Sequence, residues 1–142
     1  MATSKKIVLI GHFGVGKTSL IRRFVENTFS EDYKVTIGVH ISKKNIEIPE
    51  NESVSFIIWD LEGQDNINKT RPSYLLGTHG FIYVFDLSRP ITFENLDVEL
   101  KFLKENYSNI PVKVVGNKMD LVNKAYLTQY SSVFKPLVDF FV

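Results

Sequence analysis

The chain has 142 residues, the size of one domain, and its 17 Lys and Arg against 16 Asp and Glu give a net charge of +1. The charges are scattered rather than gathered in a basic stripe, so the composition favours neither a nucleic acid nor an anionic membrane as a partner. The absence of cysteine excludes disulfides, thiolate metal sites and a cysteine lipid anchor, and it fits a reducing, cytoplasmic location. The N-terminus has no signal-type core, no apolar run could span a bilayer, and the three histidines lack metal-ligand spacing. We expect a single globular unit over residues 1–142.

The first motif lies between a predicted strand, residues 6–10, and a predicted helix, residues 19–25. Its eight residues, Gly11-His12-Phe13-Gly14-Val15-Gly16-Lys17-Thr18, match the pattern G-x-x-x-x-G-K-[ST]. Glycines let consecutive N–H groups turn inward around phosphate oxygens, and the helix N-terminus adds positive potential. We expect Lys17 to reach the β- and γ-phosphates and the Thr18 hydroxyl to ligate Mg²⁺. A nucleoside triphosphate site is therefore predicted, against the alternative of a chance glycine-rich turn.

Residues 39–48 and 54–60 are strand-like runs joined by a polar turn, which predicts an antiparallel hairpin. The second run is apolar on both faces and is therefore expected inside the sheet. Asp60 ends it, where a carboxylate can hold Mg²⁺, usually through water. Gly63 lets a backbone N–H approach the γ-phosphate, and Gln64 is positioned to orient a water for in-line attack. The alternative is an ordinary polar strand end and turn.

The remaining chain alternates strand and helix. Apolar spacing predicts a strand at residues 80–86, a helix at 93–107, a strand at 112–116, a helix at 126–134 and the start of a last strand at 139–142. This alternation predicts a mostly parallel sheet with helices on both faces and ligands beyond the carboxyl ends of the strands.

Asn117-Lys118-Met119-Asp120 follows a buried strand and so shares the sheet edge of the phosphate loop. A carboxylate at Asp120 can accept hydrogen bonds from the N1–H and the exocyclic amine of guanine, whereas adenine has no donors at those positions. Asn117 is expected to tie this loop to the phosphate loop, and the stem of Lys118 to lie against the purine. The motif predicts guanine, against the alternative of a solvated turn.

These motifs resemble those of the Ras superfamily of small GTPases, and the Rab branch most nearly, over almost the whole chain. The resemblance rests on the phosphate loop, Tyr33 to Val39, Trp59 before Asp60, Gly63-Gln64, residues 74–80, and Asn117 to Asp120. It implies the three-layer α/β fold of P-loop NTPases, with a mostly parallel central sheet, one antiparallel edge strand and helices on both faces.

The resemblance also implies roles for single residues. Thr36 closes on Mg²⁺, Phe29 packs on the guanine edge and Tyr33 covers the phosphates. The expected catalytic residues are Gln64, Lys17 and Thr36, and the expected Mg²⁺ ligands are Thr18, Thr36 and Asp60. The expected nucleotide contacts are Gly11, Phe13, Gly14, Val15, Gly16, Lys17, Thr18, Ser19, Phe29, Tyr33, Thr36, Gly63, Asn117, Lys118 and Asp120. Effectors, exchange factors and GTPase-activating proteins are the implied partners, reading two states set by GTP and GDP.

Three features depart from the family. Phe13 stands where relatives carry a small residue, which predicts slow hydrolysis and a poor response to an activator's arginine, unless the ring points into solvent or onto a switch. Glu62 stands in place of alanine and would weaken the GTP state if it faced inward. The chain stops at Val142, before the expected Ser-Ala-Lys loop and final helix, so we expect either a shortened form or a partner that covers Phe140 and Phe141. No C-terminal lipidation motif is present in this sequence.

The leading interpretation is a Mg²⁺-dependent switch that binds GTP and GDP and hydrolyses GTP to GDP and phosphate. The alternative is a nucleotide-binding pseudo-GTPase scaffold that recruits partners without significant turnover. A third class, an ATP-dependent kinase, is disfavoured by Asn117 to Asp120.

Overall fold

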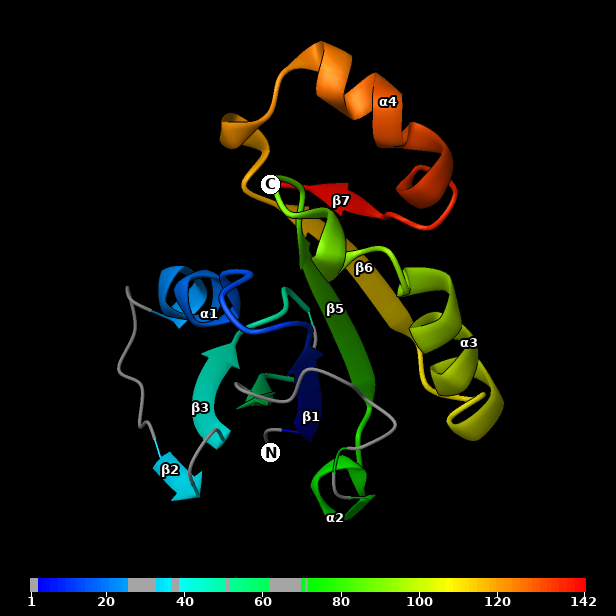
Figure 1. Cartoon of the computed structure of the whole chain (residues 1–142). Helices are drawn as coiled ribbons and strands as arrows, with labels where there is room; N and C mark the ends of the chain where they lie inside the picture. Colours follow the sequence, from blue (N-terminus) through cyan, green and yellow to red (C-terminus); the bar gives the residue numbers. More distant parts are fainter. Residues whose placement is uncertain (1–2, 26–32, 37–38, 51, 62–69, 71) are drawn as a thin grey trace.

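The fold was obtained as a computed structural model, which describes residues 3–25, 33–36, 39–50, 52–61, 70 and 72–142 (Figure 1). Its strands are β1 (Thr3–Ile10), β2 (Tyr33–Thr36), β3 (Val39–Ile46), β4 (Val54–Asp60), β5 (Gly80–Asp86), β6 (Val112–Asn117) and β7 (Phe140–Phe141). Its helices are α1 (Lys17–Val25), α2 (Pro72–Leu75), α3 (Leu96–Asn106) and α4 (Lys124–Phe134), with 3₁₀ turns η2 (Pro90–Thr92) and η3 (Met119–Leu121).

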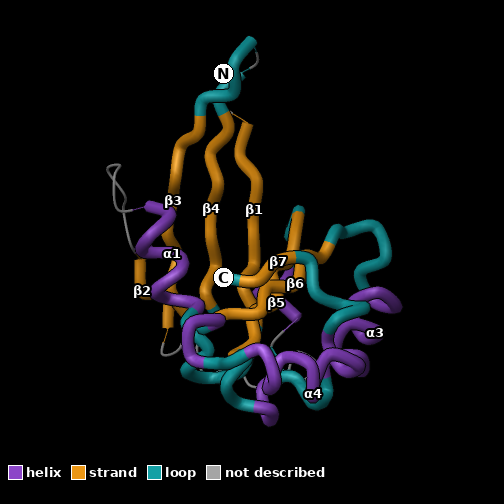
Figure 2. Tube along the Cα trace, turned by 90° about the horizontal axis from the view of Figure 1, so that it is seen from above, coloured by secondary structure: helices purple, strands orange, loops and turns teal. Residues whose placement is uncertain are grey.

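The strands form one sheet of seven in the order β2-β3-β4-β1-β5-β6-β7. The pairs from β4 to β7 are parallel, and β3 pairs antiparallel with both β4 and β2. The predicted mostly parallel sheet is therefore confirmed. The four-residue β2 was not predicted as a strand, and it lies beyond β3, so the antiparallel strand is second from the edge. Figure 2 shows β3, β4 and β1 running side by side.

Alternate residues of the central strands pack on opposite faces, which is why these strands read as continuous apolar runs. On one face, Val8, Tyr83 and Phe85 belong to the core cluster that includes Leu96 and Leu103 of α3 and Phe134 of α4. On the other face, Leu9 and Val84 pack with Ile21 and Val25 of α1. The expected helices on both faces are present (Figure 1).

Local chemistry sets the ends of the helices. α1 begins at Lys17, directly after the glycine-rich loop, two residues before the predicted start. Asn123 caps α4, because its side-chain oxygen accepts a hydrogen bond from the Tyr126 amide at 2.8 Å. α4 ends at Phe134, two residues before Pro136. η2 and a turn over residues 93–95 precede α3, which begins three residues later than the predicted helix.

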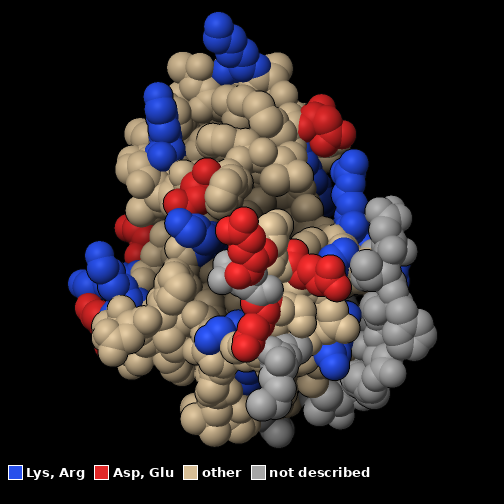
Figure 3. Space-filling model, turned by 180° about the vertical axis from the view of Figure 1, so that it is seen from behind, with Lys and Arg blue, Asp and Glu red and all other residues tan. Residues whose placement is uncertain are grey.

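The α1 face of the sheet carries an apolar groove with a cavity volume of about 640 Å³. α1, β1, β4, β5, β6 and the C-terminal residues line it, and Phe140 and Phe141 are 55% and 44% exposed. Elsewhere on the surface, Figure 3 shows acidic and basic side chains interspersed over the described part of one face, as the scattered charges predicted. Among the described residues, no helix has the length and apolar character needed to cross a membrane.

Candidate nucleotide-binding site

Four parallel strands end at the same edge of the sheet, and the predicted motifs follow directly from three of them. The phosphate loop follows β1, Asp60 ends β4, and Asn117 ends β6. β5, which lies between β1 and β6, contributes Asp86. The carboxyl edge of the sheet therefore carries the candidate site, as expected for this class of fold.

The phosphate loop and the Asn117 loop are joined by a hydrogen bond across 102 residues. The Asn117 Nδ2 atom donates to the Val15 carbonyl at 2.9 Å, which is the tie expected from the sequence. Gly16 permits this approach, because its φ is +102° and a Cβ atom there would lie 2.3 Å from the Asn117 Nδ2 atom. Only glycine fits at this point of the loop without displacing Asn117.

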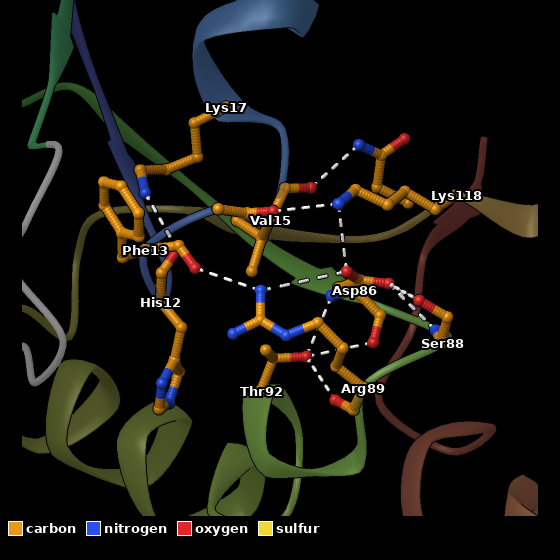
Figure 4. Close-up of polar contacts among 11 residues, drawn as sticks. His12, Phe13, Val15, Lys17, Asp86, Ser88, Arg89, Thr92 and Lys118 are labelled. Carbon is orange, nitrogen blue, oxygen red and sulfur yellow. Dashed lines mark hydrogen bonds and ion pairs between the residues drawn. The ribbon is translucent and has the colours of Figure 1, made fainter.

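Lys17 is folded back under the loop. Its side chain is 3% exposed, and its Nζ atom donates to the carbonyls of Gly11 and His12, each at 3.2 Å. Figure 4 shows the ammonium group beside the backbone of His12 and Phe13. This ammonium group is the cation that the sequence predicts to reach the phosphates.

The side chains of Thr18 and Asp60, two of the predicted Mg²⁺ ligands, lie in contact. The Thr18 hydroxyl donates to an Asp60 carboxylate oxygen at 2.7 Å, although the residues are 42 positions apart. Asp60 is 1% exposed. Magnesium takes few protein oxygens and keeps much of its water, so a hydroxyl beside a carboxylate suits it. Within the described ranges, no group of three His, Asp or Glu side chains could hold a metal instead.

Asp86 is a buried carboxylate that contacts several side chains of the site, and it was not predicted as a site residue (Figure 4). It is fully buried, and one carboxylate oxygen accepts hydrogen bonds from the Ser88 amide at 2.9 Å and hydroxyl at 2.6 Å. The other lies 3.1 Å from the Lys118 Nζ atom and 3.9 Å from an Arg89 Nη atom. Burial alone would raise the pKa of Asp86, but the Ser88 bonds and then Lys118 hold it below its ordinary value. Asp86 therefore stays ionised as an anchor for cations.

Lys118 connects Asp86 to the phosphate loop. Its Nζ atom donates to the Gly14 carbonyl at 2.9 Å, and its backbone is left-handed, with φ +64°. Asp120 follows in η3 and is exposed. The Asp120 carboxylate, which the sequence predicts to select the base, thus stands at the surface of the edge, next to the residues that bind the loop.

A second buried polar pair lies on the α3 face of the sheet. The Tyr83 hydroxyl donates to the Glu99 carboxylate, with Tyr83 1% and Glu99 8% exposed. Burial raises the pKa of Glu99, and the Tyr83 bond and the charge of His12 offset only part of the rise. Burial, and then Glu99, raises the pKa of Tyr83. Figure 4 shows the His12 side chain pointing away from the loop toward the α3 side.

The structure leaves part of the predicted site undescribed. Phe29, Glu62, Gly63 and Gln64 lie outside the described residues. Tyr33 and Thr36 lie in β2, and nothing is described of their side chains.

The other members of the set are placed at the edge of the sheet. Phe13 is 63% exposed on the phosphate loop, Ser19 is exposed on α1, and Val15 is fully buried below the loop. Asp86 and Arg89 were missed, although Asp86 ends an apolar strand as Asp60 does. The position of Asp86 was the signal that could have found it.

Comparisons with known proteins agree with this arrangement. A sequence model of the Ras family matches residues 6–133. The chain is 40% identical over 117 residues to the Ras-related protein YPTC6 of Chlamydomonas reinhardtii and 42% identical over 117 residues to the Ras-related protein RABA1g of Arabidopsis thaliana, with 82% of this chain and 54% of each relative covered.

It is also 41% identical over 121 residues to the Ras-related protein Rab-32B of Dictyostelium discoideum, with 82% of this chain and 46% of that protein covered. The chain thus spans about half the length of the curated relatives it matches. The family match covers most of the chain and its relatives are Rab proteins or close to them, so the chain belongs to the Ras family, as a Rab-like member.

Proposed function

We propose that this chain is a guanine-nucleotide switch that binds GTP and GDP with Mg²⁺ and hydrolyses GTP to GDP and phosphate. The observation that carries the proposal is the joining of the two predicted nucleotide loops, Asn117 Nδ2 to the Val15 carbonyl at 2.9 Å. This bond supports the proposal because it ties the loop that carries Asp120 to the phosphate loop. Membership of the Ras family supports the same activity.

Each loop has one task in binding. The amides of the phosphate loop and the Lys17 ammonium receive the phosphate oxygens, and the N-terminus of α1 adds positive potential. Asp120 accepts the two guanine donors, and the Lys118 stem lies against the purine. Phe29 and Tyr33 close over the nucleotide.

Thr18, Thr36 and Asp60 would hold the magnesium ion, and the 2.7 Å bond between Thr18 and Asp60 fits that role. When bound, the ion neutralises charge on the phosphate oxygens. The remaining catalysis is positioning by the chain. Gln64 orients a water whose oxygen attacks the γ-phosphorus, the bond to the β–γ bridging oxygen breaks with its electrons going to GDP, and the water's proton leaves with the phosphate.

Phe13 bears on the rate of this step. Its ring is 63% exposed on the phosphate loop, so core packing does not hold it away from the nucleotide. A ring beside the γ-phosphate would crowd Gln64 and an activator's arginine, and we therefore propose slow hydrolysis. The same observation favours the second candidate, a nucleotide-binding scaffold that recruits partners without significant turnover.

The proposed partners are effectors, exchange factors and GTPase-activating proteins that distinguish the GTP and GDP forms in the cytoplasm. They would contact the segments near Tyr33 to Val39 and Gly63 to Tyr74, whose order depends on the γ-phosphate in this family.

The test has two parts. Nucleotide released from purified protein is identified by chromatography, and phosphate release from GTP is then followed. Guanine nucleotide with turnover supports the switch, guanine nucleotide without turnover supports the scaffold, and adenine nucleotide contradicts both.

Base selection is tested with Asp120→Asn and a matched control, Asp97→Asn, which removes an exposed carboxylate from α3. Loss of a charged acceptor predicts an affinity for GDP that is lower by roughly 10- to 150-fold in Asp120→Asn and unchanged in the control. An equal GDP affinity in the two variants would contradict the role of Asp120.

A further inference from the structure

We propose that Arg89 is a positioning residue for the phosphate loop, which it holds through the Phe13 carbonyl so that retention of bound nucleotide depends on it. The inference rests on the proposed function, because it concerns how the loop keeps its phosphates. Nothing in the sequence pattern assigned a role to Arg89.

Arg89 reaches the loop from the other side of Asp86 (Figure 4). Its Nη1 atom donates to the Phe13 carbonyl at 3.1 Å, across 76 residues of sequence, and lies 3.9 Å from the Asp86 carboxylate. A Cβ atom on Gly14 would lie 3.2 Å from the same nitrogen. The guanidinium group is therefore packed against the loop backbone as well as bonded to it.

The backbone that carries Arg89 is fixed by its own hydrogen bonds. The Arg89 amide donates to the Asp86 carbonyl at 3.0 Å, and the Arg89 carbonyl accepts from the Thr92 hydroxyl at 2.7 Å and the Thr92 amide at 2.9 Å. Thr92 is 1% exposed, and its hydroxyl also accepts from the Asp86 amide at 2.9 Å. A side chain that starts from a fixed turn loses less freedom when it binds.

Because of the geometry of the peptide bond, the contact of Arg89 with the Phe13 carbonyl also sets the direction of the Gly14 N–H. In a trans peptide, the carbonyl of one residue and the N–H of the next point in opposite directions. A cation that holds the Phe13 carbonyl therefore aims the Gly14 N–H away from Arg89, and Lys118 does the same to the Val15 N–H through the Gly14 carbonyl. A charged donor on the carbonyl also polarises the peptide and strengthens its N–H as a donor.

Arg89 and Lys118 thus hold consecutive carbonyls while sharing one carboxylate oxygen of Asp86. Arginine keeps its charge at every physiological pH, and its planar fork can contact the carbonyl and the carboxylate together. The lysine side chain is shorter than that of arginine and carries its charge on a single nitrogen. The arrangement therefore predicts that Lys at position 89 replaces Arg only in part.

The test measures release of N-methylanthraniloyl-GDP from the whole chain after a chase with excess GDP. The variants are Arg89→Ala, Arg89→Lys and a control, Arg22→Ala, which removes the same charge from an exposed position on α1. We expect release to be about tenfold faster in Arg89→Ala, intermediate in Arg89→Lys and native in Arg22→Ala. Urea unfolding of the nucleotide-free proteins should give similar midpoints for Arg89→Ala and Arg22→Ala.

Native release rates in Arg89→Ala would overturn the inference, and so would equal acceleration in Arg22→Ala, which would indicate a general charge effect. A lower unfolding midpoint with unchanged release would show a merely structural contact and would overturn it as well. If Arg89→Ala does not fold, the release rate of Arg89→Lys decides in the same way. Failure of the native chain to retain any guanine nucleotide is a separate outcome that refutes the proposed function itself.

Discussion

A methyl group added at Gly11 is expected to destabilise the fold and displace the phosphate loop. A Cβ atom there would lie 2.1 Å from the Val84 carbonyl oxygen, whereas such carbon–oxygen contacts are ordinarily about 3.3–3.6 Å. Val84 belongs to β5, which is paired on both sides, so this oxygen cannot retreat. Overpacking costs about 1–3 kcal/mol and the positive φ of +149° a similar amount, so Gly11→Ala should lower the free energy of unfolding by about 2–6 kcal/mol.

Urea unfolding with Gly77→Ala as the control isolates the clash. Gly77 also has a positive φ, +72°, but a Cβ atom there meets nothing within 4 Å, so only backbone strain of about 1–2 kcal/mol is expected. GDP affinity should fall in Gly11→Ala and stay native in Gly77→Ala. Equal unfolding free energies in the two variants would refute the reasoning, since the close approach of β1 to β5 would then cost nothing.

Two further predictions concern Phe13 and Glu99. In single-turnover measurements, Phe13→Gly should hydrolyse GTP about 10- to 100-fold faster than the native chain, because the ring no longer displaces the reacting groups, and equal rates would remove the crowding hypothesis. Glu99→Gln should raise the free energy of unfolding, measured with urea, by about 1 kcal/mol, and this gain in stability should be larger at pH 8 than at pH 5. Burial raises the pKa of Glu99 in the folded state, so native stability is lost as pH rises through that pKa, whereas glutamine carries no charge. A gain that does not change with pH would show that folding does not raise the pKa of Glu99.

The strands buried on both faces were the part of the fold that the sequence predicted best. The bounds predicted for β4 and β5 match the structure, because a short, continuous apolar run between polar ends is typical of a strand covered on both faces. β2 and α2 escaped prediction, since four residues are too few to show a period. Tertiary pairing with β3, rather than local preference, makes β2 a strand.

The site divides in the same way. Motif spacing predicted the tie from Asn117 to the phosphate loop, because both segments follow strands that end at one edge. Asp86 ends an apolar strand, as Asp60 does, but it belongs to no motif. Arg89 could not have been found from spacing, since its contact with Phe13 joins segments 76 residues apart through a side chain in an irregular turn.

The fully buried carboxylate of Asp86 links two loops, since it contacts Lys118 of the Asn117 loop and Arg89, which binds the Phe13 carbonyl of the phosphate loop. If the proposed function holds, binding of the base and binding of the phosphates are coupled. Lys118 lies on the Asn117 loop, so a protein that displaces this loop would move the Lys118 cation away from Asp86 and from the Gly14 carbonyl together. The contacts to the base and to the phosphates would then weaken together, so displacement of one loop would be enough to promote nucleotide exchange.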